Sequence, residues 1–432
     1  MKKFTLNTLA LVCAAVLGGC GDAETNITEL PSTIIDHDDE HNEELSKGRL
    51  AIAAADQAMV YIFDLEDNSL VESVTLTHPA EYLYASPENR FAVAVQRSYD
   101  MVEFIDGGLW QELHNDHYDQ HIDDPVLTSF SLTDIKPTHF VPRGEQVAVF
   151  FDGNKDTGAN ASLSILTDES ISEEKVVATH DFSTYMHGTA EIRGDYVVTT
   201  LRDPDTESSL PEQIVLLELH DDHFHQEQIF ETTCPALHGS FQNDTHVAFG
   251  CSDGVLAIEQ QGSTFTAQKI ANPADMPAGA RIGSLTGSAE SNIMIGTASS
   301  TFYLIDLALQ NITPFNWQAE DGLTSMTYGF DGANEHMLIL DNQGYLNLFA
   351  AEEDWQLEQR IHVFDDLAVD ATPSIIASKA DELIYIINAQ EVTIVDLHEG
   401  EVTGHFDLNF TPGKAAWLGI AQEHDEHEGH EH

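Results

Sequence analysis

The sequence has few basic residues and few sulfur-containing residues, and each shortage excludes a class of ligand. Its 17 lysines and arginines face 74 aspartates and glutamates, so the formal net charge at pH 7 is -57. A field of this sign repels nucleic acids and anionic membrane surfaces and attracts cations and basic partners. Adaptation to salty surroundings would produce the same acidic excess. With 4 cysteines and 8 methionines, the chain offers little to Cu(I), which prefers sulfur ligands.

Several catalytic motifs are absent as well. The chain has no Gly-x-Ser-x-Gly elbow, no His-Glu-x-x-His helix and no phosphate-binding glycine loop. We therefore expect a binding protein and not an enzyme. A hydrolase with a catalytic metal ion is one alternative, and it would need an open coordination position and a positioned base.

The N-terminus predicts export. Lys2 and Lys3 precede an apolar run over residues 9–17, which is too short for a permanent membrane span and is typical of a signal peptide. The run leads into the sequence LGGC ending at Cys20, which resembles the site where bacterial lipoproteins are cleaved and acylated. We predict a lipoprotein signal peptide over residues 1–20 and lipidation of Cys20. The mature protein would be periplasmic and anchored to the inner or outer membrane.

A repeated pair of apolar strands organises the rest of the chain. The second strands of successive units begin near residues 50, 91, 147, 196, 246, 294, 337 and 383. Their spacing, roughly 41 to 56 residues, is typical of four-stranded propeller blades. Residues 414–421 supply the inner strand that the first unit lacks, so the two ends of the chain would complete one blade. We predict an all-β fold, a single β-propeller over residues 48–421 with eight four-stranded blades, or seven if one pair is misassigned.

Two cysteines lie within this repeat. Cys234 and Cys251 bracket a hairpin whose turn falls near residues 242–244, so they would lie opposite each other on neighbouring strands. In an oxidising compartment, such a pair favours a disulfide over a thiolate metal site. We predict that the two cysteines form a disulfide.

The stretch over residues 106–124 interrupts the repeat between the third and fourth strands of one blade. Connections of this length are more often functional or disordered than structural. The stretch contains histidines and aspartates but no lysine or arginine, a combination suited to Zn2+. The alternative is a solvated acidic loop. The predicted metal ligands in this stretch are Asp106, His114, Asp116, His117 and His121.

Three more histidines, His139, His187 and His238, occupy near-equivalent positions at the starts of inner strands. In a propeller these positions surround the mouth of the central channel, where imidazoles about fifty residues apart in sequence can converge on Zn2+. Each could instead simply bond the backbone at a blade junction. Regular blades place inner-strand starts and third-to-fourth-strand connections on opposite faces, so we expect at least two separate metal sites.

Acidic segments with further histidines flank the predicted propeller. Residues 21–47 lack periodicity and are predicted to be a flexible tether. Residues 422–432 contain no apolar side chain and are predicted to be a disordered tail. The histidines of these segments that could bind metal weakly are His37, His41, His424, His427, His430 and His432.

The combination resembles the AztD-type periplasmic zinc metallochaperones. The resemblance rests on the sequence DGGLW at residues 106–110 ahead of His114, on His187-Gly188, and on the segment from Cys234 through His238 to Gly254. It implies a propeller that captures Zn2+ and delivers it by ligand exchange to the solute-binding protein of a zinc ABC importer. The competing hypothesis from another class is a propeller lipoprotein that acts as a protein-interaction scaffold, for which zinc would be incidental.

Overall fold

The computed structural model describes residues 46–114, 117–220, 222–368 and 370–422, which belong to one unit that begins at Leu45. Strands dominate this part of the chain. Its helices are the 3-10 turn η1 (Arg97–Tyr99) and the short helix α1 (Asp168–Ser172). Neither of these described helices is long enough to cross a lipid bilayer.

The strands are short and evenly distributed along the sequence. Those of the first half are β1 (Arg49–Ala54), β2 (Met59–Asp64), β3 (Leu70–Thr75), β4 (Tyr82–Ala85), β5 (Phe91–Gln96), β6 (Met101–Asp106), β7 (Leu109–His114), β8 (His117–Ile122), β9 (Val126–Leu132), β10 (Pro137–Arg143), β11 (Gln146–Phe151), β12 (Ser162–Thr167), β13 (Ala178–Asp181), β14 (Ala190–Arg193), β15 (Tyr196–Leu201), β16 (Gln213–His220) and β17 (His223–Ile229). Those of the second half are β18 (Ser240–Gln242), β19 (His246–Cys251), β20 (Gly254–Gln261), β21 (Thr264–Ala271), β22 (Ser284–Thr286), β23 (Ile293–Ala298), β24 (Thr301–Asp306), β25 (Asn311–Pro314), β26 (Ser325–Phe330), β27 (His336–Asp341), β28 (Tyr345–Ala350), β29 (Gln356–His362), β30 (Ser374–Ala377), β31 (Leu383–Asn388), β32 (Glu391–Asp396), β33 (Glu401–Asp407) and β34 (Pro412–Leu418).

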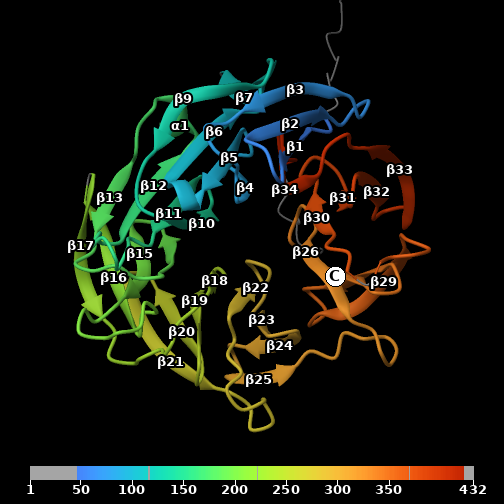
Figure 1. Ribbon diagram of the computed structural model, residues 1–432. Coiled ribbons are helices and arrows are strands. Elements are labelled where there is room, and N and C mark those ends of the chain that lie inside the picture. Colours follow the sequence, from blue (N-terminus) through green and yellow to red (C-terminus); the bar gives the residue numbers. More distant parts are fainter. Residues whose placement is uncertain (1–45, 115–116, 221, 369, 423–432) are drawn as a thin grey trace, which may run out of the picture. The chain divides into compact units, whose positions relative to one another are not determined.

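These strands form small sheets that follow one another around a ring (Figure 1). Within the described chain, six sheets have four strands, in the orders β34-β1-β2-β3, β4-β5-β6-β9, β18-β19-β20-β21, β22-β23-β24-β25, β26-β27-β28-β29 and β30-β31-β32-β33. One further sheet has eight strands. It consists of the groups β10–β13 and β14–β17, joined by a single parallel pairing of Thr179 with His223. The predicted all-β fold of small sheets is confirmed.

Buried apolar clusters lie between neighbouring sheets. Strands β1 and β5 are buried along their whole length because other sheets cover both of their faces, which explains their continuous apolar sequences. The described residues form eight such clusters, each containing side chains of two neighbouring groups of strands in the ring. One of them joins Leu50 of β1 to Tyr385 of β31, so the first sheet packs against the last.

The two ends of the described chain close this ring. Strand β34 pairs antiparallel with β1, with Leu418 opposite Arg49. The buried Trp417 donates a hydrogen bond from Nε1 to the backbone oxygen of Lys47 at 3.0 Å. The predicted completion of the first sheet by residues 414–421 is therefore confirmed, and β1 is left with no free edge.

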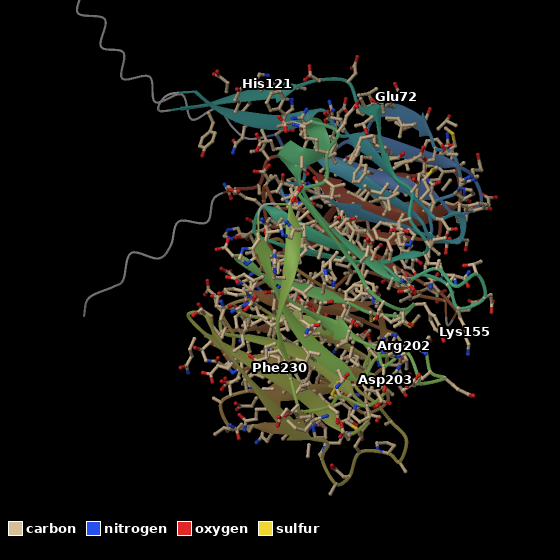
Figure 2. The ribbon with its side chains drawn as sticks, turned by 90° about the vertical axis from the view of Figure 1, so that its left-hand side faces the viewer. Glu72, His121, Lys155, Arg202, Asp203 and Phe230 are labelled. Atoms are coloured by element: carbon tan, nitrogen blue, oxygen red, sulfur yellow. A yellow bond between two sulfur atoms is a disulfide. The ribbon has the colours of Figure 1, made fainter. Side chains whose placement is uncertain are left out.

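The predicted insertion is a two-stranded hairpin formed by β7 and β8, and it connects β6 to β9, the third and fourth strands of one sheet. Arg49 anchors its base, because its guanidinium donates hydrogen bonds to the backbone oxygens of Gly107 and Asp123. Only glycine fits at position 108, where φ is +75° and a Cβ would lie 2.2 Å from the oxygen of Asp123. Figure 2 shows His121 of this hairpin on the opposite side of the ring from Arg202, which lies in the loop between β15 and β16.

Candidate metal centre

The three inner-strand histidines meet at one place, as predicted from their equivalent positions. The ring centroids of His139 and His187 lie 5.0 Å apart, and those of His187 and His238 also lie 5.0 Å apart. His139 lies in β10, whereas His187 and His238 precede β14 and β18. Three neighbouring groups of strands thus each contribute one imidazole to a single cluster.

Glycines beside two of these histidines allow the close approach. A Cβ at Gly188 would lie 2.3 Å from Oγ1 of Thr200, and a Cβ at Gly239 would lie 2.6 Å from the backbone oxygen of Gly283. The residues on the other side, Met186 and Leu237, are buried in the apolar clusters. An apolar anchor before each histidine and a glycine after it hold the imidazole at the junction between sheets.

Each of the three rings uses its Nδ1 atom for a protein acceptor. Nδ1 of His139 lies 2.6 Å from the backbone oxygen of Gly188, and Nδ1 of His238 lies 2.6 Å from that of Gly283. Nδ1 of His187 lies 3.0 Å from Oδ2 of Asp152. A carbonyl or carboxylate oxygen can only accept, so Nδ1 is the protonated nitrogen in all three rings. In the neutral imidazoles Nε2 therefore carries the free lone pair.

The surroundings favour the neutral form of two of these rings. Burial, and to a smaller extent the positive charge of a protonated His187, lower the pKa of His139 to about 4. Burial also lowers the pKa of His238. Because a neutral imidazole is the form that binds a metal ion, these rings are ready to act as ligands at neutral pH without first losing a proton.

The spacing of two of the free nitrogens suits a tetrahedral metal ion. Nε2 of His187 and Nε2 of His238 lie 3.3 Å apart. Two nitrogens bound tetrahedrally to zinc at about 2.0–2.1 Å lie about 3.3–3.4 Å from each other. Two lone pairs facing one another at this distance repel unless a cation or a proton lies between them, so the arrangement has the form of a ligand set.

Asp152 and Arg97 support this cluster, and neither was predicted from the sequence. Asp152 is buried and follows β11. Its Oδ2 atom forms an ion pair with Nη2 of Arg97 at 2.9 Å. Burial acts to raise the pKa of Asp152, but the hydrogen bonds and charges of His187 and Arg97 outweigh it and hold the pKa below its usual value. A carboxylate that accepts from Nδ1 fixes the ring orientation and makes Nε2 a stronger ligand. The available sequence signal was the single acidic residue directly after the apolar run of β11.

The insertion histidines are separate from this cluster. The backbone of His187 donates a 2.8 Å hydrogen bond to Ser209, in the same loop as Arg202, which lies on the side of the ring opposite His121 (Figure 2). Position 114 pairs with position 117 at the end of the hairpin, but the placement of these two side chains, and of Asp116, lies outside the described part of the structure. His121, the insertion histidine whose side chain is described, thus lies on the opposite side of the ring from the loop that contacts His187.

Two predicted insertion ligands have other partners. The ring of His121 stacks on Trp110 with centroids 3.9 Å apart, and its Nε2 lies 4.0 Å from a carboxylate oxygen of Glu112. The carboxylate of Asp106 is paired with Arg90 at 2.6 Å instead of with a described histidine. The base of the hairpin is thus held by stacking and an ion pair.

The remaining predicted positions fall into two groups. The disulfide between Cys234 and Cys251 is confirmed, and it closes the segment that contains His238. Its predicted position on two neighbouring strands is wrong, because β18 begins only at Ser240 and Cys234 lies in the loop before it. The lipidation site and the weak metal ligands of the flanking segments lie outside the described residues; they are Cys20, His37, His41, His424, His427, His430 and His432.

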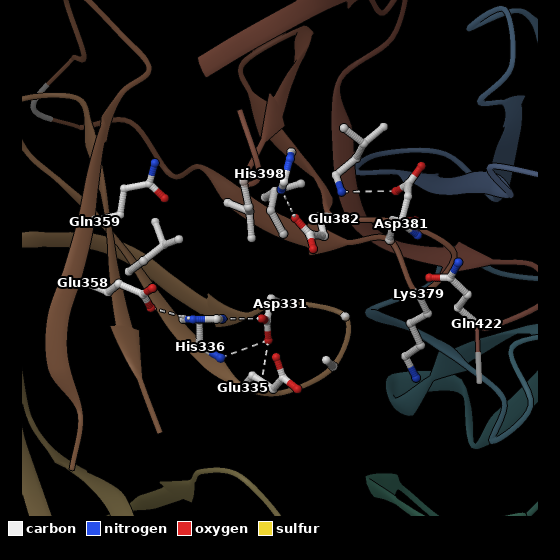
Figure 3. Close-up of a pocket in the computed structure, with 17 residues that line it drawn as sticks. Asp331, Glu335, His336, Glu358, Gln359, Lys379, Asp381, Glu382, His398 and Gln422 are labelled. Atoms are coloured by element: carbon white, nitrogen blue, oxygen red, sulfur yellow. Dashed lines mark hydrogen bonds and ion pairs between the residues drawn. The ribbon is translucent and has the colours of Figure 1, made fainter. Parts of the chain in front are cut away.

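A cavity of about 450 Å³ lies between the sheets β26–β29 and β30–β33 (Figure 3). In its wall, His336 is held by Asp331 at 2.7 Å from Nδ1 and by Glu358 at 2.8 Å from Nε2. The hydrogen bond that His336 donates to Asp331 is the main cause that raises the pKa of His336 to about 9. Asp331, Glu335 and His336 are compact enough to hold a metal ion, but the protonated ring has no free lone pair. We interpret Asp331, His336 and Glu358 as an ion triad.

Comparisons with known proteins agree with the resemblance seen in the sequence. No protein-family model matches the chain. The zinc chaperone AztD of Citrobacter koseri is 25% identical to it over 415 residues, which cover 90% of this chain and 92% of that protein. The structure of apo AztD from the same organism has a TM-score of 0.71 at 22% identity, covering 87% of this chain and 99% of that one. A second crystal structure of Citrobacter koseri AztD has a TM-score of 0.71 at 23% identity, with the same coverage. The chain is therefore similar to AztD in sequence and in fold.

Proposed function

We propose that this protein is a zinc-binding metallochaperone, which captures Zn2+ and passes it to the solute-binding protein of a zinc ABC importer without catalysing a reaction. The similarity to a zinc chaperone supports this proposal. The observation that carries it is the cluster of His139, His187 and His238, whose Nδ1 atoms all have acceptors and whose Nε2 atoms are left for a metal.

In this proposal, Zn2+ is the cargo and binds through the three Nε2 atoms. The rings are already oriented by Asp152 and by the backbone oxygens of Gly188 and Gly283, so little conformational freedom is lost on binding and the complex should be tight. Three protein ligands leave a fourth tetrahedral position for water or for a ligand of the acceptor. Release would proceed by exchange of one imidazole at a time within a complex of the two proteins.

The insertion hairpin is proposed as a second zinc site, formed by His114, His117 and His121 with Asp116. Asp106 could join it only after leaving the ion pair with Arg90. The histidines of the flanking segments, at positions 37, 41, 424, 427, 430 and 432, would bind zinc weakly and raise its concentration near the tight site.

We further propose that the fold is an eight-bladed propeller, in which the eight-stranded sheet counts as two blades. The eight apolar clusters between neighbouring groups of four strands support this count. Cleavage after residue 19 and acylation of Cys20 would tether the propeller to a bacterial membrane on its periplasmic side, through the acidic segment up to residue 47. This location would place the protein beside the importer that it serves.

The test is zinc binding and transfer by the purified mature protein. We expect tight binding that competes with a chelator, strong loss of it in His187→Ala, and no loss in His405→Ala, which removes an exposed histidine from the outer strand β33. Zinc-loaded protein should hand its metal to a purified zinc-binding solute-binding protein faster than free exchange allows. If the unaltered protein binds no zinc tightly, the scaffold hypothesis is favoured instead. If the protein shows zinc-dependent turnover that His187→Ala abolishes, the hydrolase hypothesis is favoured.

A matched truncation tests the role of the tail. A chain ending at Gln422 keeps the 2.8 Å backbone hydrogen bond from Gln422 to Lys379 and removes the last four histidines. It should load zinc more slowly while its tight site keeps its affinity. Complete loss of tight binding in this truncation would contradict the proposed division between the rigid site and the tail.

A further inference from the structure

A second group of imidazoles lies at the free end of the hairpin formed by β16 and β17. In the register of this hairpin His220 is opposite His223, and Glu218 is opposite His225. Directly opposed residues of an antiparallel pair share a face, and so do residues two apart along a strand. The register therefore gathers three imidazoles and one carboxylate on one face.

Potential ligand atoms in this group lie close together in pairs. Nε2 of His223 lies 3.1 Å from Nε2 of His225. The ring centroids of His220 and His225 lie 4.7 Å apart, and Nε2 of His220 lies 3.2 Å from a carboxylate oxygen of Glu218. Ligand atoms of Glu218, His220 and Glu227 all lie within 4.8 Å of one another.

One of these rings is oriented in the same way as His187. Nδ1 of His223 lies 3.2 Å from Oδ1 of Asp222, an acceptor, so the free lone pair of the neutral ring is on Nε2, which faces His225. A divalent cation in this acidic setting can bind the lone pair of His223 together with Nε2 of His225, which lies 3.1 Å away. Two or three imidazoles with carboxylate oxygens suit Zn2+, Ni2+ or Cu2+ better than Ca2+ or Mg2+, which prefer oxygen ligands alone.

This hairpin end cannot share a metal with the three-histidine cluster. Glu218 of β16 pairs with Tyr196 of β15, and Tyr196 in turn pairs with Arg193 at the end of β14. His187 precedes the opposite end of β14, so the length of the strand, roughly 10 Å or more, separates the two groups. His220 and His223 expose 50% and 57% of their side chains, whereas His187 exposes 25%. An exposed site exchanges its metal with solvent more readily than a buried one.

We propose that His220, His223 and His225, with Glu218, form an exposed binding site for a transition-metal dication of the zinc class. The site binds more weakly than the three-histidine cluster and exchanges faster. It does not depend on the chaperone role, because its ligands come from a single hairpin and share no residue with the cluster of His187.

The test follows the reactivity of His220 toward diethyl pyrocarbonate in the full-length protein, read by peptide mass spectrometry as zinc is added. Zinc should protect His220 in the unaltered protein and in His187→Ala. The double variant His223→Ala, His225→Ala should lose this protection. It should also bind one weakly held zinc ion fewer per chain than the unaltered protein. The matched control His405→Ala, on an outer strand of another sheet, should keep the protection.

Two results would overturn the proposal. His220 could react at the same rate with and without zinc in the unaltered protein, or zinc could protect it equally in the double variant. Glu218→Gln, which keeps the shape of the side chain, provides a milder variant if the double variant folds poorly, and it should weaken protection without abolishing it. Failure of the chaperone proposal would give a different result. The protein would then bind no zinc tightly or would not transfer it, while zinc would still protect His220.

Discussion

Nδ1 of His187 lies 3.0 Å from Oδ2 of Asp152, and the same carboxylate oxygen lies 2.9 Å from Nη2 of Arg97. The carboxylate thus holds the ring of His187 in the tautomer and orientation that direct Nε2 toward His238. Arg97 in turn holds the carboxylate. An arrangement in which the acceptor itself is fixed reduces the reorganisation needed when a metal binds.

Asp152→Asn should weaken zinc binding by about 10–100-fold, because the amide carries no charge and orients the imidazole less strongly. Competition with a chromophoric chelator measures the affinity. Asp253→Asn is the control, since it removes a half-exposed carboxylate that pairs with Lys269 on another sheet, and it should bind zinc normally. Equal affinities in the two variants would show that Asp152 does not position the ligand.

Glu191→Gln should remove a pH dependence of stability. Glu191 is buried in β14 and accepts a 2.7 Å hydrogen bond from Gln242, and burial raises the pKa of Glu191 to about 7. The folded state therefore binds this proton more tightly than the unfolded state, whose pKa is near 4.5, so stability falls as the pH rises from 4.5 to 7. Between pH 4 and pH 8, the free energy of unfolding of the variant should therefore rise by about 3 kcal/mol relative to that of the unaltered protein.

Urea denaturation at the two pH values measures this change. The exposed Glu145 provides the control, since Glu145→Gln should leave the difference between pH 4 and pH 8 as it is. If Glu191→Gln follows the unaltered protein at both pH values, the buried carboxyl does not take up the proton.

His336→Gln should act in the opposite pH range. Hydrogen bonds to Asp331 and Glu358 raise the pKa of His336 to about 9, above its unfolded value of 6.5. The stabilisation is fully present below pH 6.5 and is lost as the pH rises through 9. Because Glu358 is exposed, we expect only about 1–2 kcal/mol of the unaltered protein's stability to depend on this triad.

The free energies of unfolding at pH 6 and pH 9.5 test this prediction. The variant should be less stable at pH 6 and nearly equal to the unaltered protein at pH 9.5. His398→Gln is the matched control, because His398 lines the same cavity but is mostly exposed. A constant difference at both pH values would indicate lost packing instead of a lost ion triad.

Trp417→Ala should open the ring at the junction of the chain ends. The side chain is 3% exposed, packs in the cluster shared by the first and last sheets, and donates to Lys47. Its truncation should cost about 3–5 kcal/mol. Hydrogen exchange should rise chiefly in β1 and β34. Trp317→Ala removes an equally buried tryptophan from another cluster and should speed exchange there, while a rise spread evenly over all sheets in Trp417→Ala would contradict local opening.

The fold could be predicted well because its signals are local and repeated. Each second strand is an apolar run at a regular interval, and residues 414–421 supply the strand that the first unit lacks. The disulfide was predictable for a similar reason, since Cys234 and Cys251 are 17 residues apart and flank one hairpin. Equivalent positions in the repeat also predicted that His139, His187 and His238 would converge.

The partners of these side chains were not predictable, because they depend on contacts between sheets and on strand register. Nothing near Asp152 in the sequence indicates His187, 35 residues away, and nothing near Asp106 marks Arg90 as its partner. His220 gained its companions only from the pairing of β16 with β17. Periodicity alone determined the strands, their order and the closure by the two termini, since burial of apolar faces depends on local pattern. Only the tertiary structure decided which nitrogen atoms remain free for a metal, because that depends on hydrogen bonds formed across the junctions between sheets.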